Sequence, residues 1–273
     1  MTNRRDFIKT FVGGGAAALF VPAALAGDTD SALVARASAQ FVSSAAFAQD
    51  PWAQVPAILK RIKAPVFPKR DFAVTRYGAV AGGAADCTEA FRKAIDACAK
   101  AGGGRVVVPA GTFLTGPIHL KSNVNLHVSE GATVKFSQDT KKYLPLVFSR
   151  WEGMELMNYS PFVYAFEQQN IAVTGQGTLD GQGDNEHWWP WKGQERHGWK
   201  RGEPDQRKAR KTLEEMTERG TPVQERVFGE GHYLRPQFIQ PYRCQNVLIE
   251  GVTIRNSPMW EINPVLCTNV TVR

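Results

Sequence analysis

The amino-acid sequence predicts an all-β fold, a right-handed parallel β-helix with an N-terminal capping α-helix. Three observations predict it: a short Asn-containing pattern opens several β-prone segments, the last two of these segments begin 23 residues apart, and one amphipathic helix precedes them all. A repeat of about two dozen residues in β-prone sequence is typical of a solenoid, in which each coil buries its inward face by stacking on its neighbours.

The amphipathic helix is the first regular element of the expected domain. Its apolar stripe has helical spacing and consists of Cys87, Phe91, Ala94, Ile95 and Cys98. We expect Asp86 to cap the helix, with Glu89 at the reciprocal capping position. Glycines 102–104 end it, and a strand over 105–108 follows. This helix is expected to cover the open end of the stack, which otherwise exposes unpaired backbone.

The repeated pattern predicts four strands of one sheet. They cover residues 122–126, 169–173, 245–249 and 268–272, and each has Asn at its second position. We expect these Asn side chains to form a hydrogen-bonded ladder along the stack. The first two segments begin 47 residues apart, which we interpret as about two periods. The alternative is an antiparallel sandwich, which the absence of two-residue hairpin signals disfavours.

The four cysteines are not expected to form an obvious disulfide framework. Cys87 and Cys98 are eleven residues apart in the expected helix, so about 16 Å of helical rise separates them, which is farther than a disulfide reaches. Cys244 and Cys267 precede the last two repeats at the same offset, so we expect them on adjacent coils, as a buried thiol ladder or a disulfide. With no CxxC spacing and five scattered His, no metal site and no cofactor is predicted.

Residues 1–26 have the features of a twin-arginine export signal. Arg4 and Arg5 precede a short apolar run that closes with the small-x-small sequence 24–26. About 15 weakly apolar residues would span a bilayer poorly, so we expect a periplasmic or secreted protein with no stable membrane span in its mature form. Residues 27–70 are interpreted as a linker.

The composition is that of a globular protein and excludes disorder, collagen and coiled coil for the whole chain. The 33 basic and 26 acidic residues give a net charge of +7, which favours a polyanionic partner. The β-helix domain is expected over 71–273, with a basic insertion over 192–231 that contains a helix over 204–219. Either this insertion attracts an acidic polysaccharide, or its helix is simply solvated.

Four stretches of the domain carry a family resemblance. They are Tyr77-Gly78-Ala79 with the helix and glycines that follow, 175–183 with the Trp pair after it, 234–236, and 246–260. They resemble the polygalacturonase family, glycoside hydrolase family 28. The resemblance covers residue 71 to the last residue and implies hydrolysis of α-1,4-galacturonide linkages in pectin with inversion, without a metal. Inverting enzymes use two carboxyls roughly 6.5–9.5 Å apart.

The catalytic motifs of that family are expected beyond Arg273. They are an Asn-Thr-Asp-like motif, an Asp-Asp pair, a Gly-His-Gly and an Arg-x-Lys clamp, and none of them occurs in residues 71–273. The resemblance therefore implies an N-terminal portion whose C-terminal coils are missing, with no catalytic residue and no activity of its own. Asp180 and Asp184 are interpreted as turn residues, and Asn263 replaces a His of many relatives.

Four residues are candidates for substrate binding. Asn256 and Trp260 lie just after a predicted strand, where coils bulge into loops. Arg235 has a planar guanidinium that pairs with two carboxylate oxygens at once. Trp188 belongs to a Trp cluster that either offers rings to a sugar or packs under the insertion.

Three functional classes share one expected partner, an acidic polysaccharide such as pectin or oligogalacturonate. The leading class is the hydrolase, and the alternatives are a β-helix polysaccharide lyase and a non-catalytic pectin-binding solenoid. The sequence contains no motif that reads RNA or DNA, so nucleic acid is not an expected partner.

Overall fold

The computed structural model describes residues 50–273, so the expected export signal and the first part of the expected linker lie outside the described residues. The chain divides into two units, Met1–Pro56 and Ala57–Arg273. The short helix η1 (Pro51–Gln54) belongs to the first, and helix α3 (Val55–Arg61) spans the boundary. None of the helices within 50–273 has the length and hydropathy needed to cross a bilayer.

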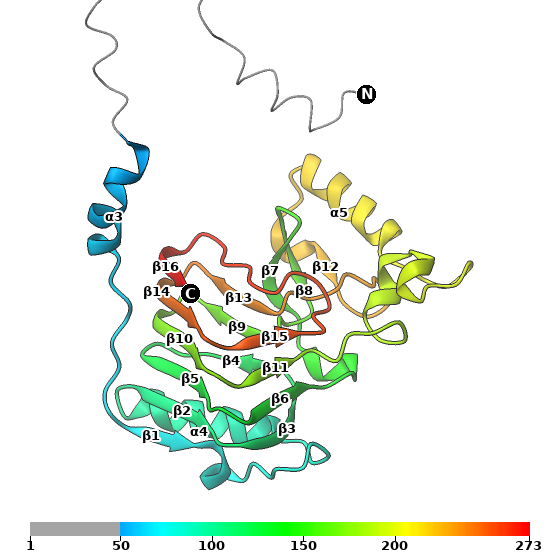
Figure 1. Ribbon diagram of the computed structural model, residues 1–273. Coiled ribbons are helices and arrows are strands. Elements are labelled where there is room, and N and C mark those ends of the chain that lie inside the picture. Colours follow the sequence, from blue (N-terminus) through cyan, green and yellow to red (C-terminus); the bar gives the residue numbers. More distant parts are fainter. Residues whose placement is uncertain (1–49) are drawn as a thin grey trace, which may run out of the picture. The chain divides into compact units, whose positions relative to one another are not determined.

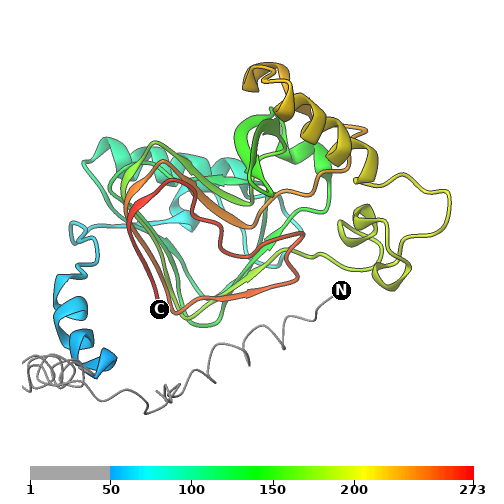
Figure 2. The same cartoon turned by 90° about the horizontal axis from the view of Figure 1, so that it is seen from above.

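Three parallel sheets run along the second unit and stack its coils on one another (Figure 1, Figure 2). The largest sheet has the order β1 (Asp71–Ala73), β2 (Gly104–Val108), β5 (Val124–Val128), β10 (Gln169–Gly175), β14 (Gln245–Glu250) and β16 (Thr268–Val272). The second has the order β15 (Thr253–Arg255), β11 (Thr178–Asp180), β6 (Ala132–Phe136) and β3 (Gly111–Thr115). The third has the order β13 (Ile239–Tyr242), β9 (Val163–Phe166) and β4 (Ile118–His119). The parallel β-helix is confirmed, and the antiparallel sandwich is wrong.

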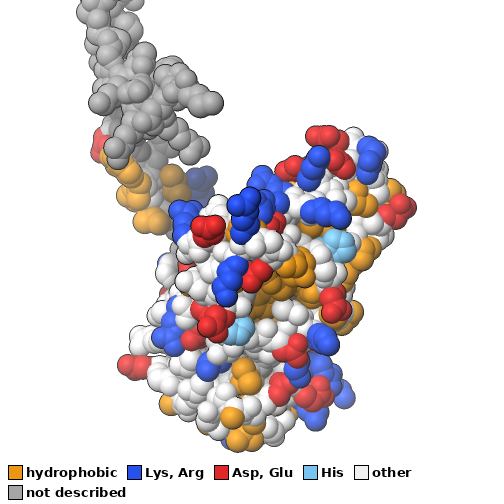
Figure 3. Space-filling view, turned by 90° about the vertical axis from the view of Figure 1, so that its right-hand side faces the viewer, with side chains coloured by type: hydrophobic (Ala, Val, Ile, Leu, Met, Phe, Trp, Pro, Cys, Tyr) orange, Lys and Arg blue, Asp and Glu red, His pale blue; other side chains and the backbone are white. Residues whose placement is uncertain are grey.

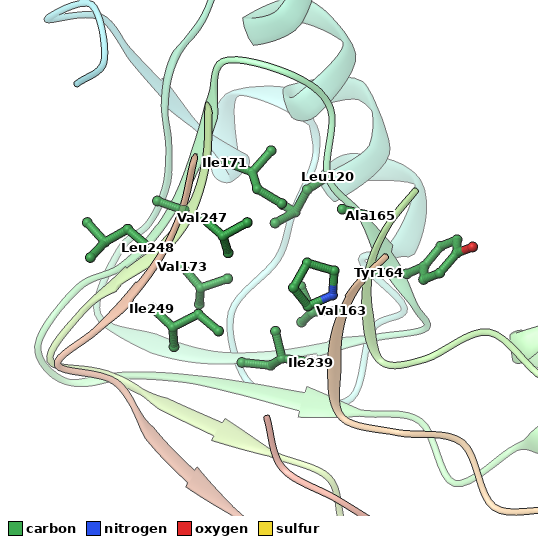
Figure 4. A pocket seen from close by; sticks show the side chains of 12 residues that line it. Leu120, Val163, Tyr164, Ala165, Ile171, Val173, Ile239, Val247, Leu248 and Ile249 are labelled. Carbon is green, nitrogen blue, oxygen red and sulfur yellow. The ribbon is translucent and has the colours of Figure 1, made fainter. Parts of the chain in front are cut away.

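The core fills the space between these sheets. Side chains alternate between the two faces of a strand, and the inward ones are Val, Ile, Leu and Phe with almost no exposed surface. Figure 4 shows Val173 of β10 and Ile249 of β14 facing Val163 of β9 and Ile239 of β13 across the interior, while Tyr164 points away from it. Each coil therefore buries its inward face between its neighbours.

The Asn ladder is present in the largest sheet. Asn170 Nδ2 donates to Asn123 Oδ1 at 3.0 Å, Asn246 Nδ2 to Asn170 Oδ1 at 2.9 Å, and Asn269 Nδ2 to Asn246 Oδ1 at 2.7 Å. All four residues have a positive φ, between 51° and 65°. Asn tolerates this left-handed conformation better than most residues, so the same residue type serves both the turn and the ladder.

The expected two periods between the first two repeats are wrong. Strands β5 and β10 pair directly, so the 47 residues that separate Asn123 from Asn170 make one enlarged coil. The extra length contains the short helix η3 (Thr140–Tyr143) and an antiparallel hairpin of β7 (Val147–Trp151) and β8 (Met154–Asn158). Glu152 and Gly153 form its two-residue turn, both with positive φ. Glu is uncommon at such a position, which is why the sequence did not indicate a hairpin.

Helix α4 (Thr88–Lys100) follows the short helix η2 (Val74–Tyr77) and packs against β1, β2 and β4 at the first coil (Figure 1). Its buried face is the expected apolar stripe. Asp86 Oδ1 accepts the Thr88 N–H at 2.9 Å, but the N-cap residue is Cys87, so Asp86 lies one position before the expected cap. The predicted reciprocal capping by Glu89 is wrong. The Glu89 carboxylate accepts from Arg92 Nε at 2.8 Å and makes no hydrogen bond to the backbone at the start of the helix.

All four cysteines are free thiols. Cys87 and Cys98 are buried as expected, and burial raises the pKa of Cys98 to about 11. Cys244 and Cys267 lie on adjacent coils, where the Cys244 N–H donates to Cys267 Sγ at 3.4 Å. The pair is a thiol ladder and not a disulfide, but only Cys244 is fully buried, whereas Cys267 is half-buried.

The chain leaves the coils after β11 and returns to them at β13. The segment between contains η4 (Trp189–Lys192), η5 (Glu195–His197), α5 (Arg207–Glu218), η6 (Val223–Glu225) and β12 (Val227–Phe228). Helix α5 corresponds to the helix expected over 204–219. Strand β12 pairs in parallel with β8, so the hairpin and the inserted segment share one small sheet beside the coils.

Candidate functional site

A cleft of about 600 Å³ lies where the inserted segment, the hairpin turn and the loop after β15 meet. Its walls are formed by side chains from these three regions and from the return to β13: Glu152, Lys192, Gly193, Gln194, Gln206, Arg207, Arg210, Arg235, Met259 and Trp260. The structure thus brings together two of the four candidates for substrate binding, Arg235 and Trp260.

A second hydrophobic cluster fixes the outer wall of the cleft. It joins the hairpin, α5 and β12 through buried side chains: Trp151, Leu156, Ala209, Leu213, Phe228 and Leu234. Trp151 Nε1 donates to the carbonyl oxygen of Arg235 at 3.2 Å, and Arg226 Nη1 donates to the carbonyl oxygen of Glu155 at 3.2 Å. Because these contacts cross between separate segments, the wall is held by packing and not by one loop alone.

Arg235 lies at the floor of the cleft with only 8% of its surface exposed. Its Nε donates to Gln206 Oε1 at 3.1 Å, and its Nη1 donates to the carbonyl oxygen of Pro258 at 2.7 Å. Burial lowers the pKa of Arg235 to about 10, and the distant charge of Glu152 offsets this only in part. The guanidinium is still charged at neutral pH, because that value lies well above 7.

Two other arginines of the cleft already have carboxylate partners. Arg207 Nε donates to Asp205 at 2.9 Å. Arg210 Nε donates to Glu214 at 3.0 Å, and its Nη2 lies 3.3 Å from Glu152 Oε2, which joins α5 to the hairpin turn. Glu152 is the single acidic side chain among the lining residues, against four basic ones. The cleft is therefore cationic.

The charges of α5 are reversed with respect to the helix dipole. Its first turns carry Arg207, Lys208, Arg210 and Lys211, with no acidic residue in the first turn and no basic residue in the last. The N-terminus of a helix has a partial positive charge, so cations there are unfavourable. At this N-terminus Asp205 Oδ1 accepts the Arg207 N–H at 2.8 Å, so the positive field at the cleft comes from the basic side chains. Such a field favours an anionic ligand.

A neighbouring histidine responds to the same field. The pKa of His197 is lowered, first by burial and then by the charges of Arg196, Lys192 and Arg235. Figure 3 shows the side of the molecule on which α5 lies, with basic and acidic side chains interspersed over the surface. The positive character therefore belongs to the cleft and not to this whole face.

Trp260 contributes an exposed aromatic surface, since 53% of its surface is accessible. Its backbone is fixed on both sides, because its N–H donates to Gln237 Oε1 at 3.2 Å and its carbonyl oxygen accepts the Phe238 N–H at 2.9 Å. An apolar ring face on a rigid backbone can pack against the apolar face of a sugar ring.

The expectation for Trp188 must be corrected. Only 2% of its surface is exposed, and its ring packs in the core against Tyr143, Phe162 and Trp191 with centroids 5.0–5.6 Å away. The packing alternative therefore holds for Trp188, because the core rings already cover the surface that a sugar would need.

Asn256 lies outside the lining of the cleft and takes part in a network around Asp180. Its Nδ2 donates to Asp180 Oδ1 at 2.9 Å, and Arg255 Nη2 lies 2.9 Å from Asp180 Oδ2. Burial tends to raise the pKa of Asp180, but hydrogen bonds from Asn256 and Gln182 and the Arg255 charge hold this pKa below its usual range. Asp180 is therefore a structural carboxylate that ties two coils together. Asp184 bonds locally, to His187.

Sequence reasoning did not single out the other polar residues that line the cleft: Glu152, Lys192, Gln194, Gln206, Arg207 and Arg210. No sequence motif marks Gln206, which accepts a hydrogen bond from Arg235. The same is true of Glu152 at the hairpin turn. Arg210 was part of the basic stretch but was not singled out. Gly153, which lies between two β-prone runs, is a weak signal for the hairpin turn, because the residue before it is Glu.

Comparisons with known proteins agree with this fold. Residues 72–134 match a family model described as rhamnogalacturonase A/epimerase, pectate lyase-like. A crystal structure of a hyperthermoactive exopolygalacturonase from Thermotoga maritima has a TM-score of 0.78 and 57% sequence identity, covering 80% of this chain and 49% of that chain.

Curated relatives match over shorter parts of their length. A probable polygalacturonase of Vitis vinifera is 26% identical over 206 residues, which is 72% of this chain and 34% of the relative. An exo-poly-alpha-D-galacturonosidase of Dickeya chrysanthemi is 34% identical over 118 residues, 40% of this chain and 19% of the relative. This chain therefore spans less than half the length of each of these proteins. These three proteins are described as a polygalacturonase or as exo-acting galacturonosidases.

Proposed function

We propose that this protein is a glycoside hydrolase that cleaves α-1,4-galacturonide linkages in pectin, with inversion at the anomeric carbon. The observation that carries the proposal is the 57% identity to the Thermotoga exopolygalacturonase over 80% of this chain. The cationic cleft supports it, because polygalacturonate carries one carboxylate on each sugar and a positive cleft raises the local concentration of such a chain.

The residues described here are assigned to binding and not to catalysis. Inverting hydrolysis needs an acid and a base on opposite faces of the sugar, and among residues 50–273 only Glu152 brings a carboxylate to the cleft. Glu152 Oε2 lies 3.3 Å from Arg210 Nη2, so it is engaged in an ion pair. We therefore name no catalytic pair in this part of the chain.

The products of the reaction distinguish the three functional classes. A hydrolase incubated with polygalacturonate produces new reducing ends without an unsaturated uronate. A lyase produces an unsaturated product that absorbs in the ultraviolet and whose formation stops when calcium is chelated. A binding protein retains oligogalacturonate and produces no new ends. The hydrolase proposal fails if the full-length protein gives either of the last two results.

We also propose that the protein is exported to the periplasm or beyond through the twin-arginine route. The test replaces Arg4 and Arg5 together by Lys and follows the protein by cell fractionation. Export predicts that the wild-type protein leaves the cytoplasm and that the double variant stays there. An unchanged distribution of the variant contradicts this route.

A further inference from the structure

Arg235 differs from the other arginines of the cleft because it has no anionic partner. Arg207 pairs with Asp205, and Arg210 pairs with Glu214 and Glu152. Within residues 50–273 no carboxylate lies within 4 Å of the Arg235 guanidinium. Burying a charge without a counter-charge is unfavourable unless hydrogen bonds or a ligand compensate it.

The guanidinium has the geometry of a preformed donor site. Nε and Nη1 are held by Gln206 and by the Pro258 carbonyl. Nη2 donates to no acceptor among the described residues and is not enclosed, since it does not belong to the fully buried, unsatisfied polar atoms. Nη2 is therefore the nitrogen of Arg235 that is left to bind a ligand in the cleft that this residue lines. A carboxylate can accept a charge-assisted hydrogen bond from this nitrogen.

The support of Arg235 is itself rigid. Gln206 is 6% exposed, and its N–H donates to the carbonyl oxygen of Trp191 at 2.8 Å. It stands directly before the first turn of α5. A neutral amide in this place orients the guanidinium without neutralising it, whereas a carboxylate would satisfy the cation internally.

We infer that Arg235 binds the carboxylate of one uronic acid residue and so discriminates an acidic sugar from its neutral methyl ester, with Gln206 as its positioning residue. The inference rests on the proposed function for the identity of the sugar chain. Trp260 offers its exposed ring to the same sugar or to its neighbour. Esterification removes the anion and leaves the buried cation unpaired, which is the origin of the discrimination.

The test compares binding of a galacturonate oligomer with binding of the same oligomer after methyl esterification, by titration calorimetry on the full-length protein. Gln206→Glu retains the size of the side chain and supplies a carboxylate 3.1 Å from Arg235 Nε in place of the amide oxygen. We expect it to raise the Kd for the acidic oligomer by about 10- to 100-fold. The Kd for the ester should not change.

Two further variants separate charge from shape. Arg235→Lys retains the positive charge but not the planar guanidinium. It is expected to weaken binding of the acidic oligomer less than Arg235→Gln does. Lys100→Gln removes one exposed positive charge from α4, outside the cleft lining, and is the matched control, with unchanged binding expected. Thermal unfolding of each variant checks that it is folded.

The outcomes distinguish the inference from the proposed function. If folded Gln206→Glu and Arg235→Gln bind the acidic oligomer as tightly as the wild type, the inference is overturned, whatever the wild type hydrolyses. If binding depends on Arg235 while the wild type releases no reducing ends, the subsite stands and the hydrolase proposal fails.

Discussion

Asn246 donates its side-chain amide to Asn170 at 2.9 Å, although the two residues are 76 positions apart. Asn269 is 23 positions from Asn246 and makes the same contact at 2.7 Å. One rung of the ladder therefore corresponds to one coil, whether the coil is short or carries an insertion. The register of the ladder is what allows the hairpin and the inserted segment to build a cleft without disturbing the stack.

The middle rung of the ladder makes the first prediction. Asn246→Ala removes two side-chain hydrogen bonds. It also places Ala, which tolerates the left-handed conformation less well than Asn, at φ 55°. We expect a loss of about 2–4 kcal/mol in the free energy of unfolding. Asn246→Gly also loses both bonds but accepts the positive φ, so it should be less destabilising. Denaturant unfolding measures both, and equal stability of Ala and wild type contradicts a structural role for the ladder.

Gly175 makes the second prediction, because here one coil touches the next. It has φ 115°, and a Cβ at this position would lie 2.0 Å from the carbonyl oxygen of Val128. Gly175→Ala should therefore destabilise the protein by more than about 3 kcal/mol or prevent folding. Gly220→Ala is the control, since its φ is 69° but a Cβ there meets nothing within 4 Å. It should lose only about 1 kcal/mol. Similar losses in the two variants argue against close stacking at Gly175.

Asp180 makes a prediction about pH. Its pKa is lower in the folded protein than in the unfolded chain. Its ionised form therefore contributes stability above the unfolded value of about 3.9, and this contribution is lost as the pH falls through the folded value. Asp180→Asn should be about 1–2 kcal/mol less stable than the wild type at neutral pH. The difference should shrink as the pH falls below the unfolded value of about 3.9 and through the lower folded value. If the difference in unfolding free energy between Asp180→Asn and the wild type is constant with pH, the ion pair with Arg255 does not contribute to stability.

The reversed charges of α5 predict opposite effects on stability and binding. Lys208→Glu places an acid at the positive end of the helix and should raise stability by about 0.5 kcal/mol. It should also slow association with polygalacturonate at low salt, an effect that disappears as salt is added. Lys100→Glu, in the last turn of α4, is the matched control. It should lower stability by a similar amount and leave binding unchanged. Weaker binding by both variants to the same degree would indicate only a net-charge effect.

The stack of coils could be predicted from the sequence because short, local sequence patterns determine it. An Asn at the start of the strand recurs in four coils, and apolar residues alternate along the strands, so both features are visible without coordinates. The stripe of α4 from Phe91 to Cys98 is equally local. The length of the coil between β5 and β10 was misjudged, because Glu152 is an unusual residue for the turn that lengthens it.

The cleft could be predicted only in part. Arg235 and Trp260 were found by residue type, but Gln206 comes from a segment 29 residues away from Arg235 and follows no period. The position of such a residue depends on tertiary packing of α5 against the hairpin. Trp188 was ambiguous for a related reason, since a Trp cluster has the same composition whether it faces solvent or the core.

The most direct test of the account is a crystal structure of the full-length protein with a bound galacturonate oligomer. The account predicts a sugar carboxylate within hydrogen-bonding distance of Arg235 and a sugar ring in contact with the indole of Trp260. An oligomer bound elsewhere, for example on the outer face of the six-stranded sheet beside Arg105 and His127, with the Arg235 cleft empty, would contradict it.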